Sequence, residues 1–347
     1  MTKKINFDEP PSLKHIHTLT TQKGLYQHCR FNEPDKKFGY SIDDNARAIL
    51  VAYKYFELYG DKKALDLASI YFRYIERAQM ESGFFHNFAS SAGNFIDKCG
   101  SQDSQGRTIW ALGYMIGHEA TSPELVKRAK KVLANFKFDL RSIRYERARS
   151  FALLGYYYAG NKDQVEKIAK KLMVRYNKFA IEPWSWFENY LTYSNAIMPY
   201  AMLLAFEITG NEEYKKIGLK SLKFLHSKCL VGDVPAPIGQ NGWYIKGKQK
   251  ALYDQQVVDV YDMVLAHAKA FELTGDIEFL NAANLWWSWF WGNNLNQMHL
   301  LNPETDGCYD GLTHNGINLN QGAESIVCYL LSYLEMANVE KKVKVGV

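Results

Sequence analysis

A short polar pattern at residues 43–49 returns at residues 103–109 with the same kinds of side chain in the same places. In both copies an acid is followed two residues later by an amide, four later by arginine and six later by isoleucine. Weaker copies occur at residues 193–196, 254–256 and 320–322. Polar residues that can cap a helix, placed ahead of apolar residues at helical spacing, are typical of a helix N-terminus. The repetition therefore predicts a fold made of equivalent helices.

A second repeated marker is a glycine followed at once by Asp or Asn, at residues 60–61, 160–161, 210–211 and 275–276. Glycine favours the end of one helix, and Asp or Asn favours the start of the next. The repeating unit is therefore predicted to be a helical hairpin, with an inner helix followed by an outer one. Six inner helices are expected, starting near Asp44, Asp103, Arg147, Ser194, Gln255 and Gln321.

Long connections separate these hairpins at residues 78–102, 227–253 and 292–319, and they are rich in Gly, Asn and aromatic side chains. The units are longer than ordinary helical solenoid repeats of roughly 34–47 residues, and these connections account for the excess. Long loops on a rigid scaffold often carry function, so we expect them to gather on one face of the molecule. The even spread of hairpins predicts one closed, all-α body.

Composition limits the possible partners of the chain. Apolar residues make up 47% and charged residues 23%, and the formal net charge is +5. The lysines are scattered and do not form a basic stripe with stacking aromatics, which argues against nucleic acid as a partner. No apolar run reaches the length of a membrane span, and there is no apolar signal core near Met1. Five widely spaced cysteines are typical of reduced thiols, so a cytoplasmic location is expected.

Several of these segments together resemble a known superfamily, namely residues 43–47 (Asp-Asp-Asn-Ala-Arg), 103–107, 186–188 (Trp-Phe-Glu) and 254–256 (Asp-Gln-Gln). The pattern is similar to the six-hairpin, (α/α)6-toroid carbohydrate-active enzymes. More narrowly, it resembles the toroid module of some bacterial proteins that are linked to glycosyltransferases. The resemblance covers nearly the whole chain. It implies a lead-in segment (1–38) packed on the toroid, a single toroid catalytic domain (39–338) and a C-terminal tail (339–347).

The resemblance also implies a cleft at the N-terminal ends of the inner helices, where Asp43, Asp44, Asp103, Glu188 and Asp254 would meet. Glycoside hydrolysis needs one protonated and one ionised carboxyl group. We therefore predict catalytic roles for Asp44, Asp103, Glu188 and Asp254, with Asp103 or Glu188 donating the proton and Asp44 or Asp254 activating water. The structural alternative is that Asp43 caps its helix or pairs with Arg47, and that Asp103 pairs with Arg107, four residues apart in each case.

The residues expected to bind the sugar are amides, arginines, acids and aromatic rings near the same helix starts. Amides and arginines meet hydroxyl groups, and aromatic rings stack on sugar faces. The predicted set is Asp43, Asn45, Arg47, Gln105, Arg107, Trp184, Trp186, Asn195, Trp243, Tyr244, Gln256, Asp310, Gln321 and Glu324. Each aromatic ring in this set is an equally good candidate for the core, and Glu324 can join the acids or pair with an arginine.

Three functions remain open from the sequence. The first is a glycoside hydrolase that cleaves a short oligosaccharide without a cofactor or a metal ion, since no two histidines lie four residues apart and the acids are dispersed. The second is a sugar epimerase or lyase, for which His28, His86 or His314 would move the proton. The third is a non-catalytic toroid that binds sugar or recruits a glycosyltransferase partner.

Overall fold

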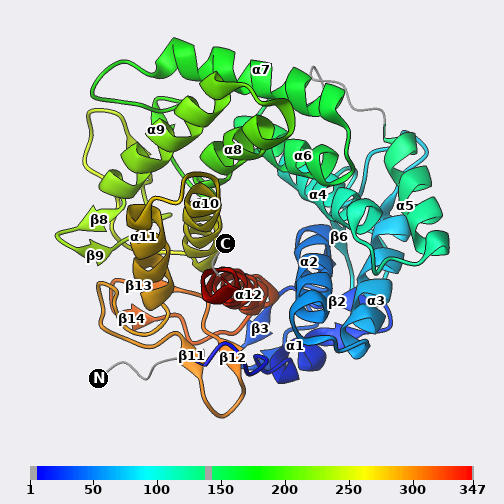
Figure 1. Cartoon of the computed structure of the whole chain (residues 1–347). Coiled ribbons are helices and arrows are strands. Elements are labelled where there is room, and N and C mark those ends of the chain that lie inside the picture. The colour runs from blue at the N-terminus through cyan, green and yellow to red at the C-terminus, as the bar shows by residue number, and fades with distance from the viewer. Residues whose placement is uncertain (1–5, 137–142, 346–347) are drawn as a thin grey trace.

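The computed structural model describes residues 6–136 and 143–345. The first five residues of the predicted lead-in and the last two of the predicted tail therefore lie outside the described residues. Its framework is a ring of six inner helices around a common axis (Figure 1). They are α2 (Ile42–Tyr59), α4 (Gln102–Gly117), α6 (Glu146–Tyr158), α8 (Ile197–Thr209), α10 (Val257–Thr274) and α12 (Ala323–Val345). Because α12 packs against α2, the ring is closed, and the predicted all-α toroid is confirmed.

An outer layer of helices surrounds this ring (Figure 1). It consists of α3 (Lys63–Ala78), α5 (Pro123–Asn135), α7 (Lys162–Phe179), α9 (Glu212–Lys228) and α11 (Ile277–Ser288). Three helices, α2, α8 and α10, end at a glycine in the left-handed conformation, namely Gly60, Gly210 and Gly275. Each glycine donates its N–H to the carbonyl oxygen of the residue four positions earlier. The next residue then leads into the outer helix, as the repeated glycine marker predicts.

The inner helices are buried on nearly all sides, and two glycines set the closest approach between them. A Cβ atom on Gly113 of α4 would lie 1.9 Å from the carbonyl oxygen of Gly155 on α6. A Cβ atom on Gly155 would in turn lie 2.2 Å from the carbonyl oxygen of Ile109. The backbones of α4 and α6 can therefore approach so closely only because both positions lack a side chain.

The lead-in and the connections between hairpins form short two-stranded antiparallel ladders. The first pairs are β1 (Thr20–Thr21) with β2 (Gly24–Leu25), β3 (Cys29–Arg30) with β4 (Glu33–Pro34), and β5 (Tyr40–Ser41) with β6 (Phe88–Ala89). The later pairs are β7 (Tyr190–Leu191) with β10 (Tyr244–Ile245), β8 (Leu230–Val231) with β9 (Val234–Pro235), β11 (Leu301–Asn302) with β12 (Gly307–Cys308), and β13 (Leu312–Thr313) with β14 (Gly316–Ile317).

Both chain ends are tied to the ring. The lead-in contains the short helix α1 (Lys14–Leu19), which lies outside the ring beside α12 (Figure 1). His15 Nε2 lies 2.7 Å from the carbonyl oxygen of Gln321, so the lead-in is hydrogen-bonded to the start of α12. At the other end α12 continues past Asn338 to Val345, where the sequence suggested a separate tail. Among the described residues, no helix is both long and apolar enough to cross a membrane.

Candidate active site at the N-terminal ends of the inner helices

The repeated amides anchor loops to the inner helices. The Asn45 side chain accepts a hydrogen bond from the Leu25 N–H at 3.0 Å, and Gln105 accepts one from the Phe85 N–H at 2.9 Å. Both side chains are buried, and each holds backbone that lies twenty residues earlier in the chain. The repeated amides at these positions therefore have a structural role as loop anchors, and sugar binding by Asn45 and Gln105 stays a prediction.

The later amides divide into two groups. Asn195 is buried and accepts a hydrogen bond from Arg147 Nη2 at 2.7 Å, while it also donates to the Thr192 carbonyl. Gln321 is buried and accepts from the Thr305 hydroxyl. These two side chains form hydrogen bonds within the protein, and their predicted contact with a sugar stays a prediction. Gln256, by contrast, lines an open cavity described below.

The two adjacent acids at the start of α2 have different environments. Asp44 is buried, accepts a hydrogen bond from the Ser41 hydroxyl at 2.6 Å and pairs with Arg47 at 2.9 Å. Burial raises the pKa of Asp44, Arg47 lowers it, and the Glu324 and Asp43 charges raise it further. Asp43 is more exposed and its carboxylate lies 3.4 Å from Arg107 of the neighbouring helix α4. The expected pairs between residues four apart are thus replaced by an i, i+3 pair and a pair between helices.

Asp103 and Glu188 are also held by neighbours. Asp103 accepts a short hydrogen bond from the Tyr193 hydroxyl. Glu188 is buried and lies 2.8 Å from Arg147, whose guanidinium also packs over the Tyr193 ring. These contacts join α4, α6 and the segment before α8 into one network. Both carboxylates lie near the inner-helix starts as predicted, but they support neighbouring side chains.

The aromatic residues of the predicted binding set fall into two classes. Trp184 and Trp186 are buried in the core, with exposures of 4% and 0%, so neither ring is available as an exposed stacking platform. Tyr244 is partly exposed and packs edge-on against Trp184. The Trp243 ring is partly exposed and lies 6.0 Å from the Tyr193 ring, next to Asp103. Trp243 and Tyr193 are therefore two neighbouring, partly exposed aromatic rings near Asp103, and neither lines the cavity described next.

A cavity of about 330 Å³ opens at this end of the ring. It lies between the loop before α10, the loop before α12 and the lead-in segment. The side chains that line it include those of His28, Asp254, Gln256, Asp310, Glu324 and Ser325. Asp254, Gln256, Asp310 and Glu324 were all predicted site residues, and the structure brings them to one cavity.

Glu324 connects this cavity to the charged network beneath it. Its carboxylate lies 2.9 Å from Arg47 Nη2, and 38% of its side chain remains exposed. Burial raises the pKa of Glu324, but the Arg47 and Arg107 guanidiniums outweigh this effect and hold the pKa below its usual value. Glu324 is therefore an ionised carboxylate that faces the cavity.

Asp310 lines the same cavity, but its pKa is shifted in the opposite direction. One oxygen accepts hydrogen bonds from the Gly322 N–H at 2.7 Å and the Ser325 hydroxyl at 2.6 Å. Burial raises the pKa of Asp310 even though these hydrogen bonds lower it, and the Glu324 charge raises it further. The cavity thus contains two carboxyl groups whose environments push their pKa values apart.

Two further acids, Asp259 and Asp262, lie on α10 and were not predicted. Both are buried, one turn apart, and each has one carboxylate oxygen without a hydrogen-bond partner among the described residues. Burial raises the pKa of Asp262 to about 7, while the Ser194 hydroxyl and the Arg107 charge lower it. The available signal was the run Val257-Val-Asp-Val-Tyr-Asp-Met263, where acids interrupt an otherwise apolar helix start. His28 completes the cavity. Within the described ranges, no three acidic, His or Cys side chains are grouped as a metal site.

Comparisons of sequence and structure give different results. No protein-family model and no curated protein sequence matches the chain. Solved structures do match over nearly the whole length. A cellobiose 2-epimerase from Bacillus thermoamylovorans has a TM-score of 0.72 at 14% identity, with 95% of this chain and 96% of that chain covered. A D-mannose isomerase has a TM-score of 0.73 at 10% identity, with 94% of each chain covered.

A hydrolase has a similar structure. The GH76 α-mannanase from Bacteroides thetaiotaomicron has a TM-score of 0.68 at 11% identity, with 96% of this chain and 95% of that chain covered. At these identities the likeness concerns the fold and not the reaction. The protein therefore has an (α/α)6-toroid fold, which these three solved structures share.

Proposed function

We propose that the protein is a carbohydrate-active enzyme, a glycoside hydrolase that cleaves a short neutral oligosaccharide in the cavity at the N-terminal ends of the inner helices. The observation that carries this proposal is the pair Asp310 and Glu324 in one cavity. Their surroundings raise the pKa of the first and lower the pKa of the second. Carboxyl groups whose pKa values are pushed apart are the usual acid and base pair of glycoside hydrolysis.

The two groups have distinct roles in this proposal. Asp310 in its protonated form donates a proton to the leaving glycosidic oxygen. Glu324, kept ionised by Arg47 and Arg107, acts on the anomeric carbon either directly or through a water molecule. Asp44, Asp103 and Glu188, predicted as catalytic, hold Arg47, Tyr193 and Arg147 in place instead. Asp254 lines the cavity and contributes to binding.

The charges around the cavity favour a neutral substrate. Arg47 already binds Asp44 and Glu324, Arg107 binds Asp43, and Arg147 binds Glu188. Each of these arginines is therefore neutralised within the protein and offers little to a carboxylate or phosphate on the sugar. The partly exposed rings of Trp243 and Tyr193 do not line this cavity, so they can stack only on a sugar unit that extends beyond it.

A second candidate, sugar epimerisation or isomerisation, is favoured by one observation. His28 lies on the cavity beside Asp310 and Glu324, and a histidine is a suitable group to move a proton near neutral pH. Two of the solved structures that share this fold are described as a cellobiose 2-epimerase and a D-mannose isomerase. His86 and His314 do not line this cavity.

Product analysis separates these functions. The purified protein is incubated in D₂O with neutral mannose- and glucose-based disaccharides, and the products are followed by NMR and mass spectrometry. The hydrolase proposal predicts monosaccharides with no deuterium on carbon. A disaccharide of unchanged size that carries deuterium on carbon would indicate epimerisation or isomerisation, and loss of this labelling in His28→Asn would then point to His28. Saccharide binding without any turnover would instead favour a non-catalytic module, such as one that serves a glycosyltransferase.

A further inference from the structure

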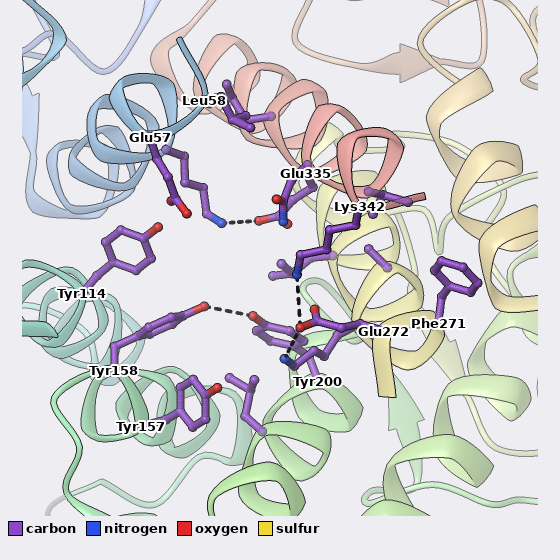
Figure 2. A pocket seen from close by; sticks show the side chains of 18 of the residues that line it. Glu57, Leu58, Tyr114, Tyr157, Tyr158, Tyr200, Phe271, Glu272, Glu335 and Lys342 are labelled. Atoms are coloured by element: carbon purple, nitrogen blue, oxygen red, sulfur yellow. Dashed lines mark hydrogen bonds and ion pairs between the residues drawn. The ribbon is translucent and has the colours of Figure 1, made fainter. Parts of the chain in front are cut away.

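The end of the ring opposite the proposed active site contains a second cavity, of about 310 Å³. Figure 2 shows the side chains that line it. They come from the C-terminal parts of several inner helices, including Glu57 of α2, Tyr158 of α6, Glu272 of α10 and Lys342 of α12. The first cavity lies beside Glu324, at the start of α12. The two cavities therefore open at opposite ends of the toroid.

The floor of this second cavity is polar, with Tyr114, Tyr200 and Glu335 buried and Lys54 and Tyr158 partly buried. Lys54 Nζ lies 2.6 Å from Glu335, and the Tyr158 and Tyr200 hydroxyl groups lie 3.2 Å apart (Figure 2). Tyr114 lies beside Lys54, whose ammonium is 5.6 Å from the ring centroid. These groups come from five of the six inner helices, so the floor is built by the ring itself. From Asp44 to Lys54 the chain climbs ten residues of α2, about 15 Å, which separates this floor from the active-site network.

The wall of the cavity is apolar, and the charges at its rim are balanced. Leu204, Leu265 and Leu334 contribute apolar surface. At the rim Glu272 lies 3.2 Å from Lys342 and 3.4 Å from Lys269 (Figure 2). The charged side chains that line the cavity are three lysines and three glutamates, and their formal charges cancel: Lys54, Lys269, Lys342, Glu57, Glu272 and Glu335.

We propose that this second cavity is a binding site for a neutral saccharide unit, distinct from the active site. Paired charges leave no net attraction for an ion, but they still offer donors and acceptors to hydroxyl groups. The Tyr158 and Tyr200 hydroxyls can each donate and accept, and the tyrosine and leucine surfaces suit the C–H face of a sugar ring. The volume lies at the lower end of the roughly 300–1,000 Å³ typical of small-molecule sites, so the site takes one sugar unit.

The test follows the methyl group of Ala268, which lines this cavity. The full chain is labelled at alanine methyl groups, and the Ala268 signal is assigned by its loss in Ala268→Ser. D-mannose, D-glucose and D-glucuronate are then titrated to tens of millimolar, with the Ala323 methyl near the active site as an internal comparison. The expected result is a saturable shift of the Ala268 signal with the neutral sugars and weaker binding of glucuronate.

Two variants locate the binding. The double variant Tyr158→Phe/Tyr200→Phe removes both hydroxyl groups at once. Because these hydroxyls are hydrogen-bonded to each other, removing both avoids leaving one of them without its partner. Ala268→Phe fills the cavity and is followed by ligand-detected NMR. The double variant is expected to weaken binding of the neutral sugars at least tenfold, and the filled variant to abolish it at this end. Tyr71→Phe, another buried tyrosine with a hydroxyl partner, is the control and should bind normally.

The proposal is overturned if neither neutral sugar shifts the Ala268 signal over this range. It is also overturned if the double variant, shown by its melting curve to be folded, binds the neutral sugars as well as Tyr71→Phe does. Tighter binding of glucuronate than of glucose would contradict the neutral ligand class. Because these readouts lie at the opposite end from Glu324, they stand whether or not the protein hydrolyses a glycoside.

Discussion

Glu324 of α12 and Arg47 of α2 form an ion pair of 2.9 Å that joins the last inner helix to the first. Arg47 also binds the buried Asp44, so one guanidinium both helps to close the ring and sets the charge on Glu324. The same contact therefore links the stability of the toroid to the chemistry of its cavity.

Replacing Arg47 by methionine should strongly destabilise the protein. The substitution leaves the buried Asp44 without its cation, and breaking a buried pair in this way costs about 3–5 kcal/mol. Urea denaturation measures the free energy of unfolding. The control is Arg128→Met, which removes a more exposed pair with Glu76 and should cost at most about 1 kcal/mol. Equal losses in the two variants would contradict the importance of the Arg47 contact.

Gly113→Ala should also be strongly destabilising, by several kcal/mol, because the added methyl group would overlap the Gly155 carbonyl on α6. Gly60→Ala provides the comparison. No atom lies within 4 Å of a Cβ atom at Gly60, so only its left-handed backbone opposes the change, at about 1 kcal/mol. Thermal unfolding of both variants gives the order. A Gly113→Ala protein as stable as Gly60→Ala would show that α4 and α6 can separate at little cost.

Asp262 should make the folded state less stable as pH rises. Its folded pKa of about 7 lies above the unfolded value of about 3.9, so its contribution is favourable below pH 4 and is lost as pH rises to about 7. After burial, the Ser194 hydrogen bond, the Arg107 and Arg47 charges and the Glu324 charge modulate its pKa. The Asp262 charge in turn raises the pKa of Asp259. Between pH 4 and 7 the titration of Asp262 should lower the free energy of unfolding by about 4 kcal/mol, and Asp262→Asn should abolish that decrease.

Urea denaturation at several pH values measures this difference between Asp262→Asn and the unsubstituted protein. The exposed Asp233→Asn serves as the control and should leave the pH dependence unchanged. Parallel stability curves for all three proteins would show that Asp262 does not titrate between pH 4 and 7.

The pH dependence of turnover should report the two cavity carboxyl groups. Arg107 helps to lower the pKa of Glu324, so Arg107→Met should move the acidic limb of the kcat/KM profile to higher pH. Arg107→Lys keeps a positive charge and should move that limb less. An acidic limb that stays in place in Arg107→Met would exclude Glu324 as the ionised group that this limb reports.

The fold was predictable because its signals are local. The Ser41 side chain caps α2 by accepting a hydrogen bond from the Asp44 N–H, and Gly60 ends the helix. Both signals lie next to the residues that form the helix. The partners of the repeated residues were not predictable, because they are distant in the sequence. Asn45 binds the backbone of Leu25 in the lead-in, and Arg107 of α4 binds Asp43 of α2. Adjacent helix residues also point in different directions, which gives Asp43 and Asp44 different environments.

Site residues near the repeated segments were suggested by the sequence, whereas those that only the closed ring brings to the site were missed. Asp310 lies in the long connection 292–319, and Glu324 follows the repeated pattern at 320–322 by two residues. Their opposite pKa shifts depend on burial and, for Glu324, on arginines from other helices. Asp259 and Asp262 lie just after the marked segment 254–256, on a helix face that only the closed ring buries.

The most direct test of the account is the turnover of Glu324→Gln and Asp310→Asn on whichever neutral oligosaccharide the unsubstituted protein cleaves. Glu304→Gln, an exposed change outside the cavity, is the control. We expect kcat to fall by at least about 10²-fold in each cavity variant, because each loses an acid or a base. Both variants should still melt in one cooperative transition, although Glu324→Gln is expected to lower the melting temperature because it removes the ion pair with Arg47. Full turnover by a folded Glu324→Gln protein would contradict the account.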